Sequence, residues 1–493
     1  MPAVKEALKA GRLLFGTVEV WLLWKLTGGL VHATDVTNAS RTLLMDIETL
    51  QWDGELCRFF DIPLSVLPAI HPSAHHYGTI SVGALAGLPL TALIGDQNAA
   101  LVGQQCFGIG QAKVTYGTGC FLIQNIGPGP LHGALKAVPA EARKQLIITV
   151  AYQFGGRPAC YAVEGSVATA GAVISWLCNE LKLVEDYRSI EPIALQESSS
   201  GGVFFVPALQ GLFAPHWDAN ATGTIIGLTS ATTRSHVVRA ALEGVAYQAN
   251  DVLSMMQPSP GGAPVGIRVD GGMACNDLLC QFLADISGSR IIRPQTTEAT
   301  ALGAAIVAGY TRRLWPELEA HIEDYMGAAA AAAGGQSLLG EVDLHELFYG
   351  QEEGGVGGGG MDKNGNVLNG TATVSSANGT TASSGLLEQL TRGLTLTNGG
   401  TANEEGGGCK RPSLQPRIFE QSQDVFEPSL EEDLRLSRIS TWRKAVERSL
   451  KWVKVEKQEQ RKENYKRLST LPLMIYVLVS FGTTILSQMV VGR

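Results

Sequence analysis

The chain has 493 residues, enough for two to three domains, and its hydrophobic content of 45% is typical of globular proteins. Its net charge of −8 and its isoelectric point near 5.7 argue against a nucleic-acid-binding protein. The eight cysteines show no zinc-ligand spacing, which favours reduced thiols in a cytosol-facing protein.

The first part of the chain predicts a helix followed by loops and a strand. Residues 13–26 are expected to form a buried helix that contains Trp21 and ends before Gly28. We expect a loop over residues 63–72 and an edge strand over residues 77–82. These elements lead to the first segment with chemical character.

That segment is Gly95-Asp96-Gln97, which follows the apolar run over residues 92–94. A carboxylate at the end of a buried strand, beside a glycine that lets a substrate approach, is where α/β folds place chemistry. An aspartate in this position is also a common N-cap or turn residue. On these residues alone both interpretations stay open.

Residues 112–123 predict two short strands joined by the turn Gly117-Thr118-Gly119. Such a turn exposes backbone N–H groups and a hydroxyl, which suit phosphate oxygens. The same sequence is also a plain hairpin turn.

A second half-site follows much later, where the strand before Asp270 ends in that acid and in Gly271-Gly272. Two strand-end glycine sites of this kind suggest a cleft between two α/β lobes that closes on a nucleotide.

The elements around these motifs alternate between strands and helices. We expect strands over residues 147–152, 159–163, 202–207, 267–269 and 290–292, and helices over residues 166–181, 234–256, 277–286 and 297–309.

The composition changes abruptly near residue 326. Residues 326–416 are rich in Gly, Ala, Ser and Thr and predict a disordered insert. Order is expected to return in a segment over residues 426–467. Its second part predicts a basic helix, with eleven Lys or Arg against four Glu between Arg438 and Arg467.

Residues 471–491 contain no charged side chain over 21 positions. At about 1.5 Å per residue this length matches the roughly 30 Å core of a bilayer. With basic flanks it predicts a transmembrane tail anchor, cytosol-facing and in the mitochondrial outer membrane; otherwise the protein is cytoplasmic. A buried terminal helix is the alternative.

Five segments in this order resemble the FGGY family of carbohydrate kinases, in particular members that phosphorylate glycerol: GDQNAALVGQ, TYGTGCF, FVPALQGLFAPHWD, VDGGMACND and TEATALGAAI. The resemblance extends from about Gly11 to Pro316 and resumes near Trp442. It implies an α/β, two-lobed, actin/hexokinase-like (ribonuclease H-like) ATPase fold.

The resemblance also implies a division of the chain. Its parts are the remainder of the N-terminal domain over 1–105, the C-terminal domain over 106–325, the insert over 326–416, the closing segment with its basic helix over 426–467, and the tail over 471–491. We expect the first lobe to be incomplete, because the first phosphate-binding hairpin of the family has no counterpart in the sequence.

Site roles follow from the same resemblance. Asp96 would be the general base, Gln97 would hold a glycerol hydroxyl, and Phe121 would pack on the polyol carbons. Gln97 in place of an asparagine favours glycerol over pentuloses. The nucleotide would contact Gly117, Thr118, Gly119, Gly171, Ser175, Gly271, Gly272 and Asn276. Mg²⁺ would neutralise the β- and γ-phosphates, with Asp96 as an indirect ligand.

The implied activity is ATP-dependent phosphorylation of glycerol to sn-glycerol 3-phosphate, by a homo-oligomer. The alternative is a catalytically inactive, truncated kinase that acts as a membrane-anchored binding or scaffold protein.

Overall fold

The structure is a computed structural model that describes residues 2–256, 266–295, 298–316, 319–320, 322 and 423–452. The predicted insert over 326–416 and the predicted tail over 471–491 lie outside these residues. Among the helices that the structure describes, none is both long and apolar enough to cross a membrane. The predicted membrane attachment and mitochondrial location therefore stay predictions.

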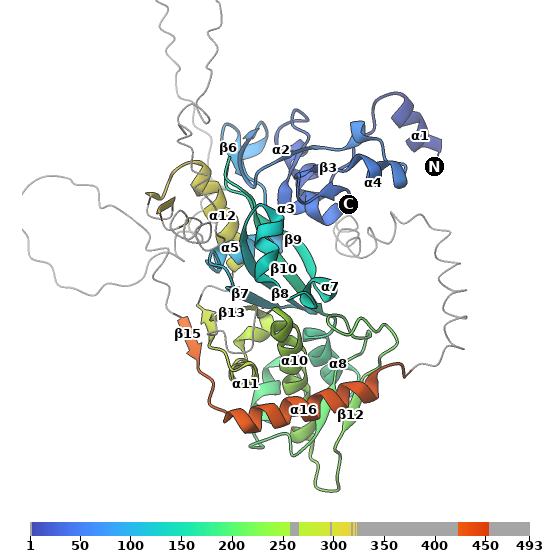
Figure 1. Ribbon diagram of the computed structural model, residues 1–493, viewed down its shortest axis with the longest axis vertical. Coiled ribbons are helices and arrows are strands. Elements are labelled where there is room, and N and C mark those ends of the chain that lie inside the picture. The colour runs from blue at the N-terminus through green and yellow to red at the C-terminus, as the bar shows by residue number, and fades with distance from the viewer. Residues whose placement is uncertain are drawn as a thin grey trace, which may run out of the picture. The chain divides into compact units, whose positions relative to one another are not determined.

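A mixed seven-stranded sheet forms the centre of the fold, with the strand order β15-β14-β13-β7-β8-β10-β9 (Figure 1). Its strands are β7 (Ala112–Tyr116), β8 (Cys120–Pro128), β9 (Ile147–Tyr152), β10 (Cys160–Val167), β13 (Ile267–Gly271), β14 (Ile291–Pro294) and β15 (Gln423–Phe426). β13 runs parallel to β7 and β14, and the other neighbours are antiparallel. The predicted hairpin over residues 112–123 is confirmed.

One face of this sheet is apolar, and the long helix α10 (Arg234–Met256) packs against it. Val114, Leu122 and Val163 point to this face from three neighbouring strands, and each is 0% exposed. α10 has the bounds that its apolar periodicity predicts, because a stripe repeating every three to four residues must face the core.

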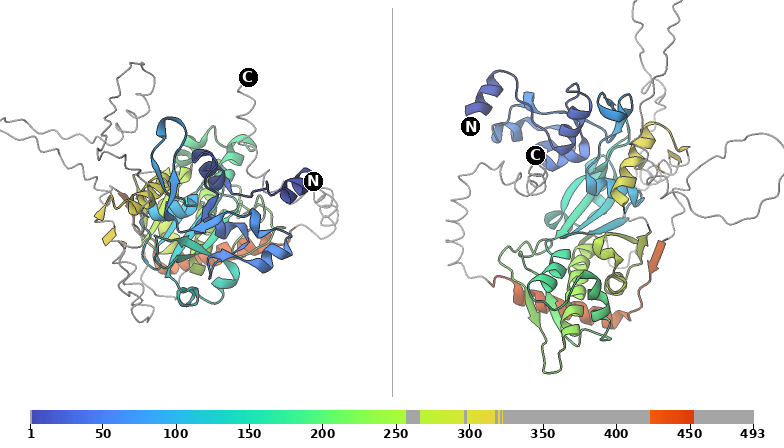
Figure 2. Two further views of the ribbon diagram at one scale, coloured as in Figure 1. Left: turned by 90° about the horizontal axis from the view of Figure 1, so that it is seen from above. Right: turned by 180° about the vertical axis from the view of Figure 1, so that it is seen from behind.

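The helices on this side are α8 (Gly171–Asn179), α9 (Ile190–Ala194), α11 (Asp277–Ser287) and α16 (Glu432–Ser449). α16 runs along this helical layer in each view of Figure 2. Its Trp442 is fully buried, stacks on Tyr247 of α10 at 4.9 Å, and donates its indole N–H to Asp251 at 2.8 Å. The β11 (Phe204–Val206) and β12 (Thr224–Ile226) pair packs against α10 and α16.

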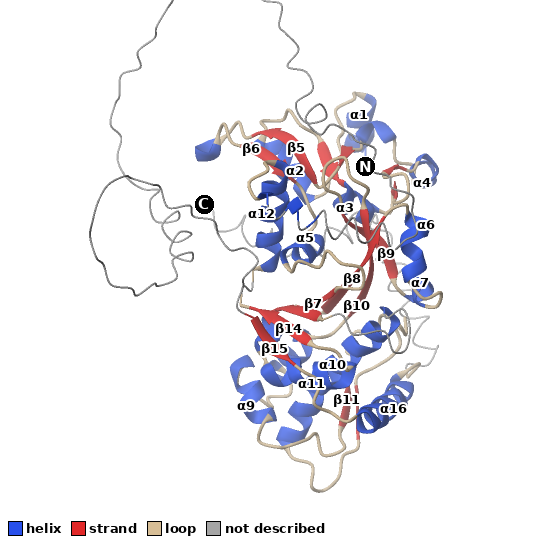
Figure 3. Cartoon of the chain, turned by 60° about the vertical axis from the view of Figure 1, so that its left-hand side comes forward, coloured by secondary structure: helices blue, strands red, loops and turns tan. Residues whose placement is uncertain are grey.

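The other face of the sheet meets α5 (Asp96–Gly103), which packs against α12 (Ala299–Thr311) (Figure 3). The two helices approach so closely that a Cβ on Gly303 would lie 1.7 Å from the carbonyl oxygen of Ala99. A Cβ on Gly103 would lie 2.0 Å from the carbonyl oxygen of Ala299. Backbone therefore rests on backbone at this crossing, which only glycine permits.

The N-terminal region consists of short elements around three small sheets. Its helices are α1 (Pro2–Lys9), α2 (Val18–Leu26), α3 (Val36–Ala39) and α4 (Gly54–Phe59), and its strands are β1 (Ala33–Asp35), β2 (Met45–Asp46), β3 (Gln51–Trp52), β4 (Ala69–His71), β5 (Ala74–Thr79) and β6 (Pro89–Ala92). β1 pairs with β4, β2 with β3, and β5 with β6. α6 (Leu131–Ala134) and α7 (Ala142–Gln145) lie between β8 and β9.

Several sequence expectations are wrong in detail. The helix expected over 13–26 begins only at Val18, and its Trp21 is 60% exposed rather than buried. The loop expected over 63–72 contains β4, because residues 69–71 pair in parallel with β1. The edge strand expected over 77–82 lies at residues 74–79.

The helix expected over 166–181 is also wrong at its start. Strand β10 continues to Val167, because Ser166 pairs with Phe121 and Val167 with Cys120 in the ladder to β8. The helix begins at Gly171 instead. Gly165 and Ser166 favour neither a helix nor a strand strongly, so their pairing with β8 decides their conformation.

Candidate active site

Asp96 is the first residue of α5, and Gly95 is its N-cap. β6 ends at Ala92, so the acid follows a three-residue connection rather than a strand directly. The Asp96 Oδ1 accepts the backbone N–H of Gln97 at 2.7 Å, and the side chain is exposed. Asp96 is thus neither an N-cap nor buried in a turn, and its carboxylate is accessible to a ligand.

A buried aspartate in the N-terminal region supports this helix start. Asp35 is 0% exposed and accepts the Thr37 hydroxyl at 2.7 Å and the Ser73 hydroxyl at 2.7 Å. Thr37 gives its only hydroxyl hydrogen to Asp35, so its oxygen accepts the N–H of Gly95 at 2.8 Å. Burial raises the pKa of Asp35, while these hydrogen bonds oppose the rise. The chain Asp35–Thr37–Gly95 therefore fixes where α5 begins.

A buried lysine of the sheet forms a hydrogen bond with α5. Lys113 of β7 is 0% exposed, and its Nζ donates to Gln97 Oε1 at 2.6 Å and to Thr115 Oγ1 at 2.6 Å. Burial lowers the pKa of Lys113, and the nearby carboxylates of Asp270 and Asp96 act in the opposite direction. This contact joins the helix that carries Asp96 to the hairpin that carries the glycine turn.

The register of the strands gathers polar groups on this same face. Thr115 lies beside Asp270 on one side and beside Phe121 on the other. Asp270 is buried and accepts Gln104 Nε2 at 3.0 Å through Oδ2, whereas its Oδ1 has no hydrogen-bond partner among the residues that the structure describes. The Phe121 ring is 38% exposed on this face. The apolar face of the sheet is therefore structural, and the opposite face carries the candidate chemistry.

The Gly-Thr-Gly turn is held by the start of α8. Gly171 N–H donates to Gly117 O at 2.9 Å, and the N–H groups of Ala170 and Ala172 both donate to Thr118 O at 3.0 Å. A Cβ on Gly171 would lie 2.6 Å from Gly117 O, so this contact requires glycine. Gly117 N–H itself closes the turn onto Gly119 O at 2.9 Å. The Gly117 amide is therefore used within the turn rather than offered to a ligand, so the expectation that the turn exposes its N–H groups is wrong for this amide.

The second glycine site packs directly on the first hairpin. Gly271 has φ +86°, and a Cβ there would lie 2.3 Å from Tyr116 O, the residue before the turn. Gly272 in contrast faces open space, because no atom of the described residues, apart from its own chain neighbours, lies within 4 Å of a Cβ. The structure thus brings the turn, Gly171 and Gly271 together, as two half-sites for one ligand require.

Two further residues expected at the nucleotide already have local structural contacts. Asn276 caps α11, since its Oδ1 accepts the N–H of Leu279 at 2.7 Å. Ser175 is exposed one turn along α8, and its hydroxyl donates to Gly171 O at 3.3 Å.

Sequence reasoning missed several groups of the site. Lys113 stands out in the sequence only as the one charged residue of its strand. Glu164, two residues before the helix expected over 166–181, lies in β10 and forms a bidentate ion pair with Arg41 at 2.7 and 3.1 Å. The pattern Asp35-x-x-Asn38 is a recognisable N-cap signal, because both oxygens of Asp35 accept backbone N–H groups of α3.

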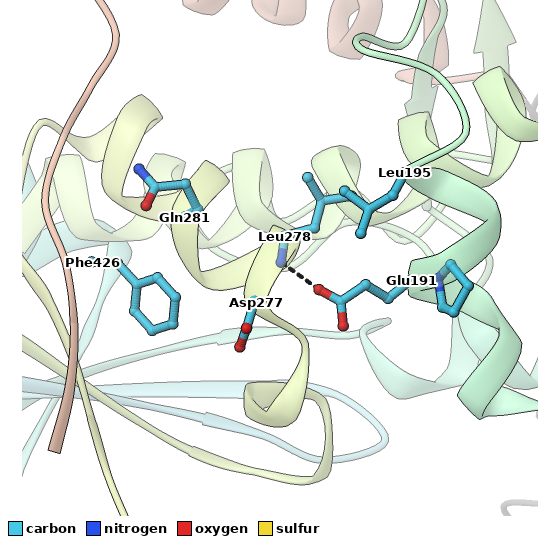
Figure 4. Close-up of a pocket in the computed structure, with 7 residues that line it drawn as sticks. Glu191, Leu195, Asp277, Leu278, Gln281 and Phe426 are labelled. Carbon is cyan, nitrogen blue, oxygen red and sulfur yellow. Dashed lines mark hydrogen bonds between the residues drawn. The ribbon is translucent and has the colours of Figure 1, made fainter. Parts of the chain in front are cut away.

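A pocket of about 560 Å³ opens elsewhere, between α9, α11 and β15, and is lined by Glu191, Pro192, Leu195, Asp277, Leu278, Gln281 and Phe426 (Figure 4). Glu191 Oε1 accepts the N–H of Leu278 at 2.8 Å there. One residue of the pocket lining, Asp277, directly follows Asn276 in the chain.

Two family models match the chain. The N-terminal domain of the FGGY family of carbohydrate kinases matches residues 2–103, and its C-terminal domain matches residues 112–312. A glycerol kinase of Koribacter versatilis is 46% identical over 343 residues, which cover 68% of this chain and 67% of that protein. A glycerol kinase of Roseiflexus sp. is 47% identical over 322 residues, covering 65% and 63%.

Among solved structures, the glycerol kinase of Plasmodium falciparum with ADP aligns at a TM-score of 0.59 and 39% identity, over 66% of this chain and 63% of that one. A ligand-bound xylulose kinase of Lactobacillus acidophilus aligns at a TM-score of 0.52 and 22% identity, which shows a common fold. The class that the fold defines is that of proteins with the actin/hexokinase-like fold. The chain belongs to the FGGY family of carbohydrate kinases. It spans 63% of the length of the Roseiflexus relative, less than two thirds.

Proposed function

We propose that the chain transfers the γ-phosphoryl group of ATP to glycerol and so forms sn-glycerol 3-phosphate and ADP. The observation that carries this proposal is the Lys113–Gln97 contact of 2.6 Å, which sets the acid at the start of α5 against the hairpin that bears the Gly-Thr-Gly turn. The identity of 46–47% with glycerol kinases, and the structural match to one with ADP, support glycerol and ATP as the substrates.

Asp96 acts as the general base in this proposal. Its exposed carboxylate accepts the proton of the glycerol hydroxyl as that oxygen attacks the γ-phosphorus. Proton transfer by a positioned side chain contributes typically about 10²–10⁴ in rate. Asp35 and Thr37 act at a distance by holding Gly95, the residue before the base.

Gln97 and Phe121 would bind the polyol. Gln97 lies half-buried beside the base and offers an amide to a hydroxyl, and the exposed Phe121 ring offers an apolar surface to the carbon chain. A small triol needs both kinds of contact, because its hydroxyl groups and its carbon chain are recognised by different groups.

The nucleotide would lie along the glycine half-sites. The turn over residues 117–119 would approach the phosphates, and Gly171, Ser175, Gly271, Gly272 and Asn276 would line the remainder. The open space beside Gly272 supports this placement. No neighbouring atom of the described residues requires a glycine at this position, so the close approach of a ligand would explain why it has no side chain.

Magnesium fits this site only as a nucleotide-borne ion. Among the described residues no three His, Cys, Asp or Glu side chains group closely enough to hold a metal alone. Mg²⁺ usually binds through one or two carboxylates together with substrate phosphates, and the exposed carboxylate of Asp96 suits such an indirect contact. When bound, the ion would neutralise charge on the β- and γ-phosphate oxygens.

The experiment measures glycerol-dependent ADP release by the purified full chain with Mg²⁺ and ATP, with the product identified by phosphorus NMR. The Asp96→Asn variant should lose at least about a hundredfold in kcat while its unfolding temperature stays unchanged. Asp433→Asn, the same change at an exposed position of α16, should leave the activity intact. A wild-type chain that is folded but releases no ADP with glycerol would refute the proposal.

A further inference from the structure

Lys113 carries a buried ammonium group, and its two hydrogen bonds differ in what they connect. It is 0% exposed in the middle of the sheet and donates both to Thr115, on its own strand, and to Gln97, on another element. A buried charge costs several kcal/mol in desolvation, and stability alone is weak reason to keep one. The contact with Gln97 is the one that reaches the substrate-binding part of the site.

The chemistry of lysine determines how the Gln97 amide is oriented. An ammonium has three hydrogens to donate and no lone pair to accept with, so it can only face an oxygen. The Gln97 side chain must therefore turn Oε1 towards Lys113, as the 2.6 Å distance shows. Its Nε2, with two N–H groups, is then at the other corner of the amide, away from the ammonium.

Neighbouring carboxylates help to keep Lys113 charged in this position. Asp270 and Asp96 both favour its protonated form, against the effect of burial. Asp270 is anchored in turn by Gln104 at 3.0 Å. A neutral lysine could accept as well as donate, and the orientation of the amide would then be undetermined.

We propose that Lys113 is a positioning residue that fixes the Gln97 amide, so that Gln97 Nε2 donates to a hydroxyl oxygen of the bound polyol. This inference rests on the proposed function for the identity of the substrate, and it specifies the polarity of one substrate contact. The polyol hydroxyl at Gln97 acts as a hydrogen-bond acceptor. Without Lys113 the amide is free to rotate and the contact is lost for part of the time.

The test is a double-mutant cycle in the full chain, with Lys113→Met, Gln97→Ala and both together. Lys113→Met and Gln97→Ala should each raise the KM and the Kd of glycerol about tenfold, as expected for one lost hydrogen bond. The double variant should be no worse than Gln97→Ala, because Lys113 acts through the amide. The KM of ATP should stay within about twofold, a selectivity that a general loss of structure would not produce.

Gln97→Glu serves as the second variant, because Lys113→Met leaves carboxylates without their cation and can destabilise the fold. A carboxylate at residue 97 keeps the contact with Lys113 and strengthens it by charge, but it has no hydrogen to donate. We expect an unfolding temperature equal to or above that of the wild type, together with a glycerol Kd raised about tenfold or more. A Gln97→Glu variant that binds glycerol as well as the wild type would refute the donor role.

The outcomes separate this inference from the proposed function. If the wild type phosphorylates glycerol and the effects of the two single variants multiply in the double, the positioning role is refuted and the function stands. If the wild type binds glycerol in calorimetry without turnover, the function fails, and the cycle in Kd still decides the role of Lys113. A wild type that neither binds nor phosphorylates glycerol refutes both.

Discussion

Gly303 of α12 lies against the carbonyl oxygen of Ala99 in α5 so closely that a Cβ at residue 303 would be 1.7 Å from it. α5 begins with Asp96, and the Thr300 hydroxyl of α12 lies 3.5 Å from the carbonyl oxygen of Asp96. The position of the candidate base is therefore set in part by a helix that follows the second glycine half-site in the chain.

We expect Gly303→Ala to displace α5 and with it Asp96. Overpacking a tight contact costs about 1–3 kcal/mol, and a shift of about 1 Å at a reacting group can cost 10² in rate. The measurements are the unfolding temperature and the kcat for glycerol, both of which should fall. Gly133→Ala is the matched control, since a Cβ on that helical glycine of α6 meets nothing within 4 Å. Unchanged kinetics in Gly303→Ala would contradict the coupling of the two helices.

Gly272→Ala should separate ligand binding from stability. Apart from its chain neighbours, the new methyl group meets no atom of the described residues within 4 Å, so the unliganded protein should unfold within about 0.5 kcal/mol of the wild type. If the nucleotide lies in this open space, the KM of ATP should rise about tenfold while that of glycerol stays constant.

Gly171→Ala provides the contrast, because its Cβ would lie 2.6 Å from Gly117 O. That variant should lose stability as well as ATP affinity, by pushing away the Gly-Thr-Gly turn. An unaltered KM of ATP in Gly272→Ala would argue against the proposed place of the nucleotide.

Removing either partner of the ion pair between Arg41 and Glu164 should destabilise the protein by different amounts. Glu164 is 8% exposed and Arg41 is 44% exposed. Arg41→Met leaves a buried carboxylate without its partner and should cost about 2 kcal/mol, below the usual cost for a fully buried pair because solvent reaches the arginine. Glu164→Gln should cost less, since it removes the buried charge and leaves the exposed one.

Urea unfolding of the two single variants and the double variant would measure this difference. If both single variants lost the same free energy of unfolding, burial of Glu164 would not contribute to the cost of breaking the ion pair.

Much of the central sheet could be predicted from the sequence, and much of the contact network could not. The periodicity of α10 and the alternation of β7 and β8 are local signals, and they predict those elements correctly. The Lys113–Gln97 contact depends on how α5 lies over the sheet, which no local pattern contains. The helix expected over 166–181 starts later, because pairing with β8, and not the local sequence, keeps Ser166 and Val167 in a strand.

His75 should make the fold sensitive to acid. Burial lowers the pKa of His75 to about 4 from its usual 6.5, and the neighbouring His71 and His76 add repulsion to its charged form. Between pH 6.5 and about 4 the unfolded chain binds a proton at this residue that the folded chain does not. Stability should therefore be complete above pH 6.5 and fall as the pH decreases.

The expected loss is about 1–2 kcal/mol, less than the full shift implies because the ring is only half-buried. Thermal unfolding at pH 7 and pH 5 measures it, and His75→Gln should reduce the pH slope, whereas His132→Gln at an exposed position should not. The same slope in His75→Gln and in the wild type would assign the acid sensitivity to other groups.

The pairing of β14 with β15 affects how the protein can fold during synthesis. Residues 291–294 form their ladder with residues 423–426, so the ribosome must add more than a hundred residues before this partner emerges. Until then β14 is an edge with unpaired backbone groups, a strand that other chains can pair with. Closing the longer loop costs little extra free energy, because that cost grows only with the logarithm of loop length. The long interval between the two strands therefore delays the pairing of β14 during synthesis rather than lowering the stability of the folded protein. Nascent chains stalled within this interval should be the ones most exposed to aggregation and to chaperones.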